Sequence, residues 1–380
     1  MKKNKGTWIA ALMFLLIGGE AGLFMGRALR RLGLDDGDWL HSMATLAVML
    51  WGLILAMVVQ IAVHEAGHGV FGALTGYRLV SYRIFSLMWL RDGDRLRFCR
   101  FSLAGTGGQC LMEPPGDDPN ADFPVTLYNL GGSLLNLICT AVCFLLAWAF
   151  ERSPVAWMLL GASGVVGVGF ALVNGLPLTP NMMNNDGRNA LELRRDATAR
   201  RAFWIQMKIN ALTGRGVRLK DMPAEWFALP GGEEMNASLT ATLAVLAANR
   251  LMDERRFAEA DALMARLLAN PGAIPGIYRA MLTCDRIYCE LIGENHPQAV
   301  DAMLDKTQLK AMKALAKLPS VMRTQYALAL IHEKDAARAA RLETRFNALL
   351  AKYPYPVEAR CERELMERAR IKNEQQEVIP

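Results

Sequence analysis

The chain has 380 residues, of which 52% are hydrophobic and 21% charged, and its 43 basic side chains exceed its 37 acidic ones for a formal net charge of +6. This composition excludes an intrinsically disordered protein, and the length suffices for two or three domains whose cores need no disulfides. The first 189 residues carry only 14 of the basic and 13 of the acidic side chains. We therefore expect the two halves of the chain to face different surroundings.

Four long stretches of the first half are apolar enough to cross a bilayer. A helix needs about 20 residues to cross about 30 Å of hydrocarbon. The first stretch, residues 7–26, contains one charge, at Glu20, and the other three, residues 44–63, 123–150 and 153–185, contain none. A cleaved signal peptide is the alternative for the first, but this stretch is longer than the apolar part of a signal peptide. We predict a mainly α-helical membrane core with about four transmembrane helices, at residues 7–28, 43–73, 124–150 and 154–176.

Basic residues near the helix ends set the predicted orientation. Six arginines lie between residues 77 and 122, and many basic residues follow residue 186. Positively charged loops tend to stay in the cytoplasm, so four crossings place this loop and both termini there. The compact core favours a bacterial plasma membrane. The seven cysteines form no C-x-x-C pair and are odd in number, which argues against a disulfide framework.

An HExxH motif, His64-Glu65-Ala66-Gly67-His68, lies at the cytoplasmic end of the second predicted span. Residues i and i+4 of a helix share a face, so both imidazoles can bind one zinc ion while Glu65 reaches a neighbouring water. Ionisable side chains at membrane depth are costly unless they bind something. The alternative is a pair of core histidines at a helix end, with Glu65 facing water.

A catalytic zinc site takes a third protein ligand, which we predict to be Asp186. It is the only acidic residue between Arg152 and Glu192, and it follows directly on the fourth apolar stretch. That stretch also ends on the predicted cytoplasmic side, at the membrane depth of His64 and His68. The alternative for Asn-Asp-Gly is an ordinary turn at a helix end.

These motifs together resemble the site-2 protease family of intramembrane zinc metallopeptidases. Besides HExxH, the family has an Asn-x-x-Pro, here Asn174–Pro177, that leads to an Asp-Gly, here Asp186-Gly187. A Gly-x-x-x-Asn on the intervening helix, here Gly132–Asn136, is also similar. The resemblance covers about residues 44–190. It implies one catalytic Zn²⁺, asparagines close to the metal, and cleavage of proteins within the membrane.

The chain departs from the family pattern between Pro177 and Asp186. This segment is longer than is usual in the family, and Asn185 stands where an apolar residue or proline is common. The departure bears on the geometry of Asp186 rather than on its identity as a ligand.

The predicted chemistry is peptide hydrolysis. Zinc held by the two histidines and Asp186 would polarise the substrate carbonyl and lower the pKa of its water toward about 7. Glu65 would take the proton and return it to the leaving amine. Asn136, Asn174 and Pro177 would support the site or hold substrate, and the alternative for both asparagines is hydrogen bonding between helices. Glu20 would either face the cleft or pair with a neighbouring helix.

A β-structured loop is expected at residues 77–112. Residues 77–85 and 96–101 alternate as strands do, and a turn at residues 91–94 separates them, so the sequence predicts a β-hairpin. Site-2 proteases similarly carry a β-structured loop after HExxH. A free edge of this hairpin would pair with an unwound substrate. The alternative is a surface hairpin without substrate contact.

The predicted membrane-embedded domain covers residues 1–189, and residues 190–234 form a connecting segment. Residues 235–380 contain helical pairs with spacings similar to a tetratricopeptide repeat, and a generic helical bundle is the alternative. We expect this cytoplasmic module to bind a protein partner. Nucleic acid is not expected, because basic and acidic residues are interleaved along it.

Three classes of function compete. The leading prediction is a zinc-dependent intramembrane endopeptidase that cuts a membrane-embedded or membrane-associated protein or peptide near the cytoplasmic face. The alternatives are a proteolytically inactive relative that acts as a membrane-anchored binding scaffold, and a metal transporter or storage protein. Only the enzyme needs a base beside the histidines, so Glu65 discriminates among the three.

Overall fold

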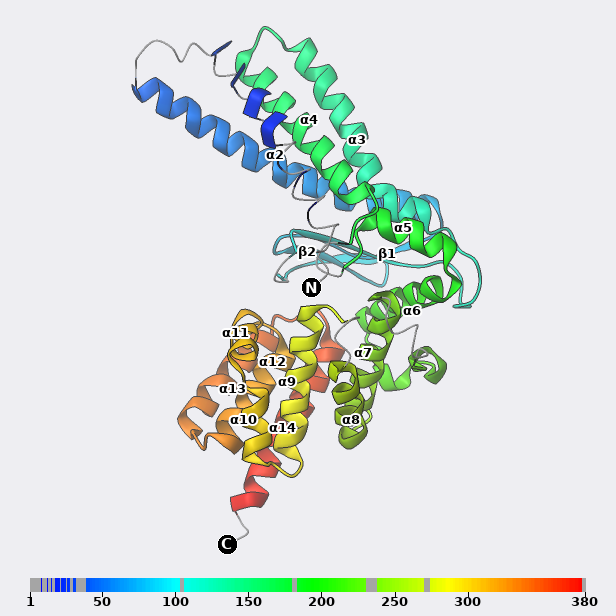
Figure 1. Ribbon diagram of the computed structural model, residues 1–380, viewed down its shortest axis with the longest axis vertical. Coiled ribbons are helices and arrows are strands. Elements are labelled where there is room, and N and C mark those ends of the chain that lie inside the picture. The colour runs from blue at the N-terminus through cyan, green and yellow to red at the C-terminus, as the bar shows by residue number, and fades with distance from the viewer. Residues whose placement is uncertain are drawn as a thin grey trace. The chain divides into compact units, whose positions relative to one another are not determined.

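The computed structural model describes residues 39–102, 106–179, 183–229, 238–269 and 274–377, together with single positions between residues 8 and 31. Within it the chain divides into two compact units (Figure 1). The first unit comprises residues 1–85 and 106–200, and the second comprises residues 86–105 and 201–380. Each unit has its own packing and is described separately.

Three helices of the first unit are long and apolar enough to cross a membrane: α2 (Trp39–Leu74), α3 (Thr126–Ala149) and α4 (Pro154–Gly175). They pack against one another (Figure 1) and agree closely with three of the predicted spans. The fourth prediction, residues 7–28, lies largely outside the described residues, so it stays a prediction. Glu20 is among the described positions, and its side chain is exposed.

The outer surfaces of these three helices are strongly apolar. Trp51 on α2 is 68% exposed, and Leu145 and Trp148 on α3 are 65% and 74% exposed. Between the helices, small residues allow close approach, as at Gly67 of α2, whose backbone meets that of Gly131 on α3. Large apolar side chains outside and glycines inside are the pattern of helices packed in lipid, where burial of apolar surface gives little driving force.

A four-stranded sheet follows α2, with strand order β3-β2-β1-β4. Strand β1 pairs antiparallel with β4, with Tyr82 opposite Cys110, and β2 pairs antiparallel with β3. The predicted single hairpin is therefore wrong in its pairing, because residues 96–101 pair with β2 and not with β1. The alternation identified both strands, but it carried no information about which partner each would choose. The strands are β1 (Arg78–Ile84), β2 (Leu87–Asp92), β3 (Arg95–Arg100) and β4 (Gly108–Glu113).

Two helices follow the α4 segment. The short α5 (Asp186–Arg195) packs against α3 and α4, and α6 (Ala197–Gly214) carries the chain into the second unit. In α6, Trp204 and Ile205 are fully buried, so part of the predicted connecting segment 190–234 belongs to a packed core. The irregular stretch after it contains two 3₁₀ turns, η2 (Leu219–Asp221) and η3 (Ala224–Phe227).

The described part of the second unit is helical apart from β2 and β3. Residues 238–253 and 257–269 form a helix pair, α7 and α8, whereas residues 297–314 form two shorter helices, α10 and α11. These unequal lengths do not establish a repeat, and the tetratricopeptide likeness stays a prediction. The elements are α7 (Ser238–Asp253), α8 (Phe257–Ala269), α9 (Gly276–Ile292), α10 (Pro297–Met303), α11 (Lys306–Ala314), α12 (Pro319–Ala327), the π-helical η5 (Leu328–His332), α13 (Ala336–Leu350) and α14 (Pro356–Glu377).

Candidate metal centre

The two histidines of the HExxH motif and Asp186 converge on one point in the first unit. Nε2 of His64 lies 3.0 Å from Oδ2 of Asp186 and 3.2 Å from Nε2 of His68. Nε2 of His68 lies 3.4 Å from the same carboxylate oxygen. Both histidines are buried, with 7% and 8% of their surface exposed. The structure thus brings together the three predicted ligands, which are 122 residues apart at the extremes.

His68 is held by a backbone contact. Its Nδ1 lies 2.8 Å from the carbonyl oxygen of Tyr128 at the start of α3. A carbonyl only accepts, so Nδ1 carries the proton and donates it. In the neutral imidazole, Nε2 then has no proton and turns its lone pair to the convergence point.

His64 is held by a chain of two amides. Its Nδ1 lies 2.8 Å from Oδ1 of Asn136, whose Nδ2 donates to the carbonyl oxygen of Gln60 at 2.9 Å and to its Oε1 at 2.7 Å. Because both contacts of Nδ2 are acceptors, the Asn136 amide orientation is set, and Oδ1 receives the proton of His64 Nδ1. Asn136 thus contacts His64 directly, while its predicted role in supporting a metal site stays a prediction.

Gln60 is a site residue that the sequence reading missed. It is fully buried, and its Nε2 donates to the carbonyl oxygen of Ser163 on α4 at 3.0 Å. It links α2, α3 and α4 directly behind His64. Its position in the sequence could have indicated this role. Gln60 lies one helical turn before His64, and it is the only side-chain amide in the apolar stretch of residues 44–63.

The convergence of these three atoms is chemically incomplete without a positive charge between them. With Nδ1 of both histidines protonated, the two neutral Nε2 atoms and the Asp186 oxygen are all acceptors. Three acceptors at 3.0 to 3.4 Å repel one another unless a cation or a bound proton lies among them. Two imidazole nitrogens and one carboxylate form a donor set that suits Zn²⁺, and the hydrogen bonds on both Nδ1 atoms are the partners that metal-binding histidines commonly have.

Asp186 reaches the histidines because Asn185 ties the end of α4 to the start of α5. The Asn185 side chain donates to the carbonyl oxygens of Val173 and Leu176 at 2.7 and 2.6 Å, and its Oδ1 accepts from the backbone N–H of Arg188 as the N-cap of α5. Asn185 therefore fixes the start of α5, and with it Asp186, relative to the end of α4.

Gly187 allows the first turn of α5 to lie directly on the end of α4. A Cβ at this position would collide with the carbonyl oxygen of Gly175. No residue with a side chain fits there without moving α5, and Asp186 would move with it.

Burial and hydrogen bonding act in opposite directions on Asp186. Burial by itself would raise the pKa of this carboxyl, but when His64 and His68 are protonated and donate from Nε2, their hydrogen bonds and charges outweigh burial and hold the pKa below its ordinary value. Asp186 is thus ionised and available as an anionic ligand at neutral pH.

Glu65 lies beside the convergence point and against strand β4. A Cβ on Gly108 would stand 2.6 Å from Glu65 Oε1, so the carboxylate occupies the space that a side chain would need there. Strand β4 is an edge strand of the sheet and contacts α2. The predicted pairing of substrate with a free strand edge stays a prediction, and β4 is the edge nearest to Glu65.

Neither Asn174 nor Pro177 of the Asn-x-x-Pro motif hydrogen-bonds to His64, His68 or Asp186 in the described part of the chain. The side chain of Asn174 donates to the carbonyl oxygen of Phe170, one turn earlier on α4, at 3.0 Å. Pro177 is exposed and follows the end of α4. Their predicted roles in substrate binding stay predictions, whereas the contact of Asn174 belongs to its own helix.

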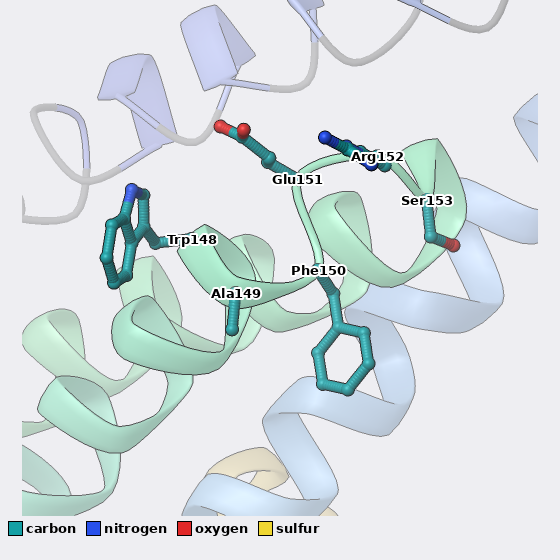
Figure 2. A pocket seen from close by; sticks show the side chains of 6 residues that line it. All are labelled: Trp148, Ala149, Phe150, Glu151, Arg152 and Ser153. Atoms are coloured by element: carbon teal, nitrogen blue, oxygen red, sulfur yellow. The ribbon is translucent and has the colours of Figure 1, made fainter.

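A hollow of about 620 Å³ occurs at the turn between α3 and α4, lined by residues 148–153. Figure 2 shows that the side chains of this turn spread in different directions rather than toward a common point. The turn lies at the opposite end of α3 from Tyr128, so this hollow is not part of the metal centre.

No protein-family model, no curated protein and no solved structure matches this chain.

Proposed function

We propose that this protein is a zinc-dependent intramembrane endopeptidase. The observation that carries the proposal is the convergence of His64, His68 and Asp186, with each histidine oriented through Nδ1 and with Glu65 alongside. The helices α2, α3 and α4 would cross the membrane, since each is long and apolar enough. The substrate would be a membrane-embedded or membrane-associated protein or peptide, cut near the cytoplasmic face.

The residues of the site have distinct tasks in this mechanism. His64, His68 and Asp186 would hold Zn²⁺, which supplies Lewis acidity toward the scissile carbonyl and acidifies a water. Glu65 takes the proton of the attacking water and delivers it to the departing amine nitrogen as the peptide bond breaks. Asn136 and the Tyr128 carbonyl keep both imidazoles in the tautomer whose Nε2 binds a cation.

The location of the centre supports cleavage near a membrane surface. Helix α2 has 36 residues, which corresponds to about 54 Å, whereas a hydrocarbon core is about 30 Å thick. The histidines lie in the last third of α2 and Asp186 lies beyond the end of α4. A site at these positions is close to the end of two spans rather than at the centre of the bilayer.

The proposal is tested by Glu65→Gln and Asp186→Ala. We expect purified Glu65→Gln to retain zinc and lose cleavage, since the amide cannot accept the proton, and Asp186→Ala to lose zinc. Metal analysis of the detergent-purified proteins measures their zinc content. Mass spectrometry of membrane proteins that accumulate uncleaved in cells measures the loss of cleavage.

Glu151→Gln is the matched control, because Glu151 lies in the exposed turn between α3 and α4. It should resemble the wild type in both measurements. Zinc retention together with cleavage at the wild-type rate in Glu65→Gln would contradict the mechanism, and absence of zinc from the wild-type protein would contradict the metal site.

A further inference from the structure

The second unit contains a cavity of about 290 Å³ that is separate from the metal centre. Its walls come from α6, α7, α9, α12 and α14, which are labelled in Figure 1. Binding pockets for small molecules have volumes of about 300 to 1,000 Å³, so this cavity suits one small group rather than a folded segment. Its lining is unusually rich in charge for the interior of a helical unit.

Arg323 of α12 is the central cation of this cavity. It is 1% exposed, and its guanidinium lies 4.3 Å from the centre of the Tyr288 ring. One terminal nitrogen donates to Asp285, and the other lies 3.3 Å from Oε2 of Glu362. Among the described residues, Nε of Arg323 has no hydrogen-bond partner. A buried guanidinium N–H without an acceptor is costly, which indicates that something in the cavity accepts from it.

The acidic side chains around Arg323 exceed the positive charge available to them. Asp285, Glu358 and Glu362 line the same cavity, whereas Arg323 is the cation paired with two of them. Glu358 accepts a hydrogen bond from the Tyr353 hydroxyl at 2.9 Å. Three carboxylates near one guanidinium leave an excess of negative charge inside the unit.

Glu362 is the carboxylate left without adequate partners. Its Oε2 is buried and receives no hydrogen bond within the described part of the chain, although Arg323 is near. Burial raises the pKa of Glu362 to about 7, an effect that Arg323 reduces and that Asp285 and Glu358 increase. This carboxylate is available to a donor that enters the cavity.

The basic residues at the other side of the cavity do not supply that donor. Arg218 bonds Asp253 at 2.6 Å and Glu364 at 3.1 Å, and Arg255 also donates to Glu364. Arg255 also lowers the pKa of Glu362, and its Nη1 has no hydrogen-bond partner among the described residues. The only ion pair of Glu362 in the described part of the chain is nevertheless the one with Arg323, so Arg255 offsets the excess of negative charge only in part. A ligand that fits must bring positive charge to Glu362 and an acceptor to Nε of Arg323.

From these contacts we propose that the cavity binds a lysine or arginine residue, with its ammonium or guanidinium group donating to Glu362 and its carbonyl oxygen accepting from Arg323. A basic residue within a polypeptide and a free basic amino acid share this chemistry. The site is independent of the metal centre, and it gives the helical unit a way to recognise basic polypeptide segments.

The test uses the full-length, detergent-purified protein and titration calorimetry with four probes. These are acetyl-Gly-Lys-Gly-amide, acetyl-Gly-Arg-Gly-amide, free lysine, and acetyl-Gly-Gln-Gly-amide as the neutral control. At about 10 mM, each probe would saturate a site with a Kd near 1 mM. We expect at least one basic tripeptide or free lysine to bind at least tenfold more tightly than the glutamine tripeptide. Binding by the tripeptides alone identifies a polypeptide ligand, and binding by lysine alone identifies the free amino acid.

The variant Glu362→Gln should weaken the binding of the basic probe at least tenfold, because it removes the charged acceptor. The matched control is Glu367→Gln on the same helix, where Glu367 is exposed and pairs with Arg370, and it should bind as the wild type does. Glu358→Gln serves as a second cavity variant, with a weaker loss in the same direction, should Glu362→Gln not fold. Equal binding of basic and neutral tripeptides, or unchanged affinity in the cavity variants, would overturn the proposal.

Discussion

At the scale of single residues, the metal centre depends on side chains that do not contact the proposed metal. Oδ1 of Asn136 accepts the hydrogen bond from Nδ1 of His64, and Gln60 accepts from Nδ2 of Asn136, which fixes the orientation of the Asn136 amide. Both side chains are fully buried, where an unsatisfied amide would cost about 1 to 3 kcal/mol. The chain of hydrogen bonds therefore stabilises one tautomer of His64 at a polar point between three apolar helices.

Replacing Asn136 by alanine should weaken zinc binding about 10 to 100-fold, since His64 loses the partner that orients it. Competition with a chelator of known affinity measures this change. Asn129→Ala is the matched control. Asn129 is buried on the same helix, but within the described residues its side chain donates only to the Val125 carbonyl oxygen. Equal zinc affinity of the two variants would show that the Asn136 contact does not matter for the metal.

Gly108→Ala tests the position of Glu65. The new Cβ would stand 2.5 Å from Glu65 Cγ and 2.6 Å from Oε1, so the side chain must swing away from strand β4. Zinc should remain bound, while the cleavage rate should fall by about 100-fold, because a displacement near 1 Å at a catalytic group has an effect of this size. Turnover of an identified substrate and metal content are measured together. Gly276→Ala, at a position with open space, is the control, and a wild-type rate in Gly108→Ala would contradict the assigned role.

At the scale of elements, the start of α5 is the part on which ligand geometry depends. The Asn185 side chain bonds four backbone groups, of Val173, Leu176, Leu178 and Arg188, and Gly187 allows α5 to contact the end of α4. The ten-residue α5 also packs against α3, the helix that orients both histidines. A short helix with these constraints places a carboxylate more accurately than a free loop would.

Gly187→Ala should displace α5 and reduce zinc binding at least tenfold, although the alanine substitution leaves all three ligands in the sequence. The reason is the collision of the new Cβ with the Gly175 carbonyl, a backbone atom that cannot rotate away. Zinc content after dialysis against a weak chelator is the measurement, and Gly276→Ala again provides the control. A zinc affinity equal to that of the control would show that α5 tolerates the shift.

At the scale of the whole molecule, the two units differ in how they accommodate buried charge. The first unit buries His64 and His68 toward the end of an apolar helix and Arg83 on strand β1, whereas the second buries Arg323 and several carboxylates within a helical interior. Because burial raises the pKa of Glu362 to about 7, the folded second unit retains a proton that the unfolded chain, with an ordinary glutamate pKa near 4.5, releases. A higher folded pKa means that folding is favoured at the lower pH.

The free energy of unfolding of the second unit should therefore decrease as pH rises from about 4.5 to about 7, by up to about 3 kcal/mol from this group. The charged groups that act on Glu362 are Arg323, Asp285, Glu358 and Arg255, and the pKa of Glu358 is raised in the same direction. Urea unfolding followed by tryptophan fluorescence at several pH values measures the change. Glu362→Gln should flatten this dependence and Glu367→Gln should not, and an equally steep dependence in both variants would contradict the assignment.

Much of the local structure could be read from single segments of the sequence. Uncharged stretches specified α2, α3 and α4 within a few residues, because a long helix in an apolar environment needs little beyond length and composition. The spacing of His64 and His68 likewise implied a shared face, since the helical repeat alone places them together. The pairing of β1 with β4 was not readable, because period-two alternation does not select a partner strand.

The sequence by itself determined the residue types of the proposed ligands, the helical face that carries two of them, and the apolar segments that contain this face. Only the tertiary structure decided that Asp186 meets the histidines, since that contact requires the Asn185 cap and the bare backbone of Gly187 on α4. It also decided that Gln60 orients Asn136, which contacts His64, and that Oε2 of Glu362 receives no hydrogen bond within the described part of the chain. Local patterns follow from the geometry of one element, whereas a site built from several elements depends on the packing that brings distant side chains together.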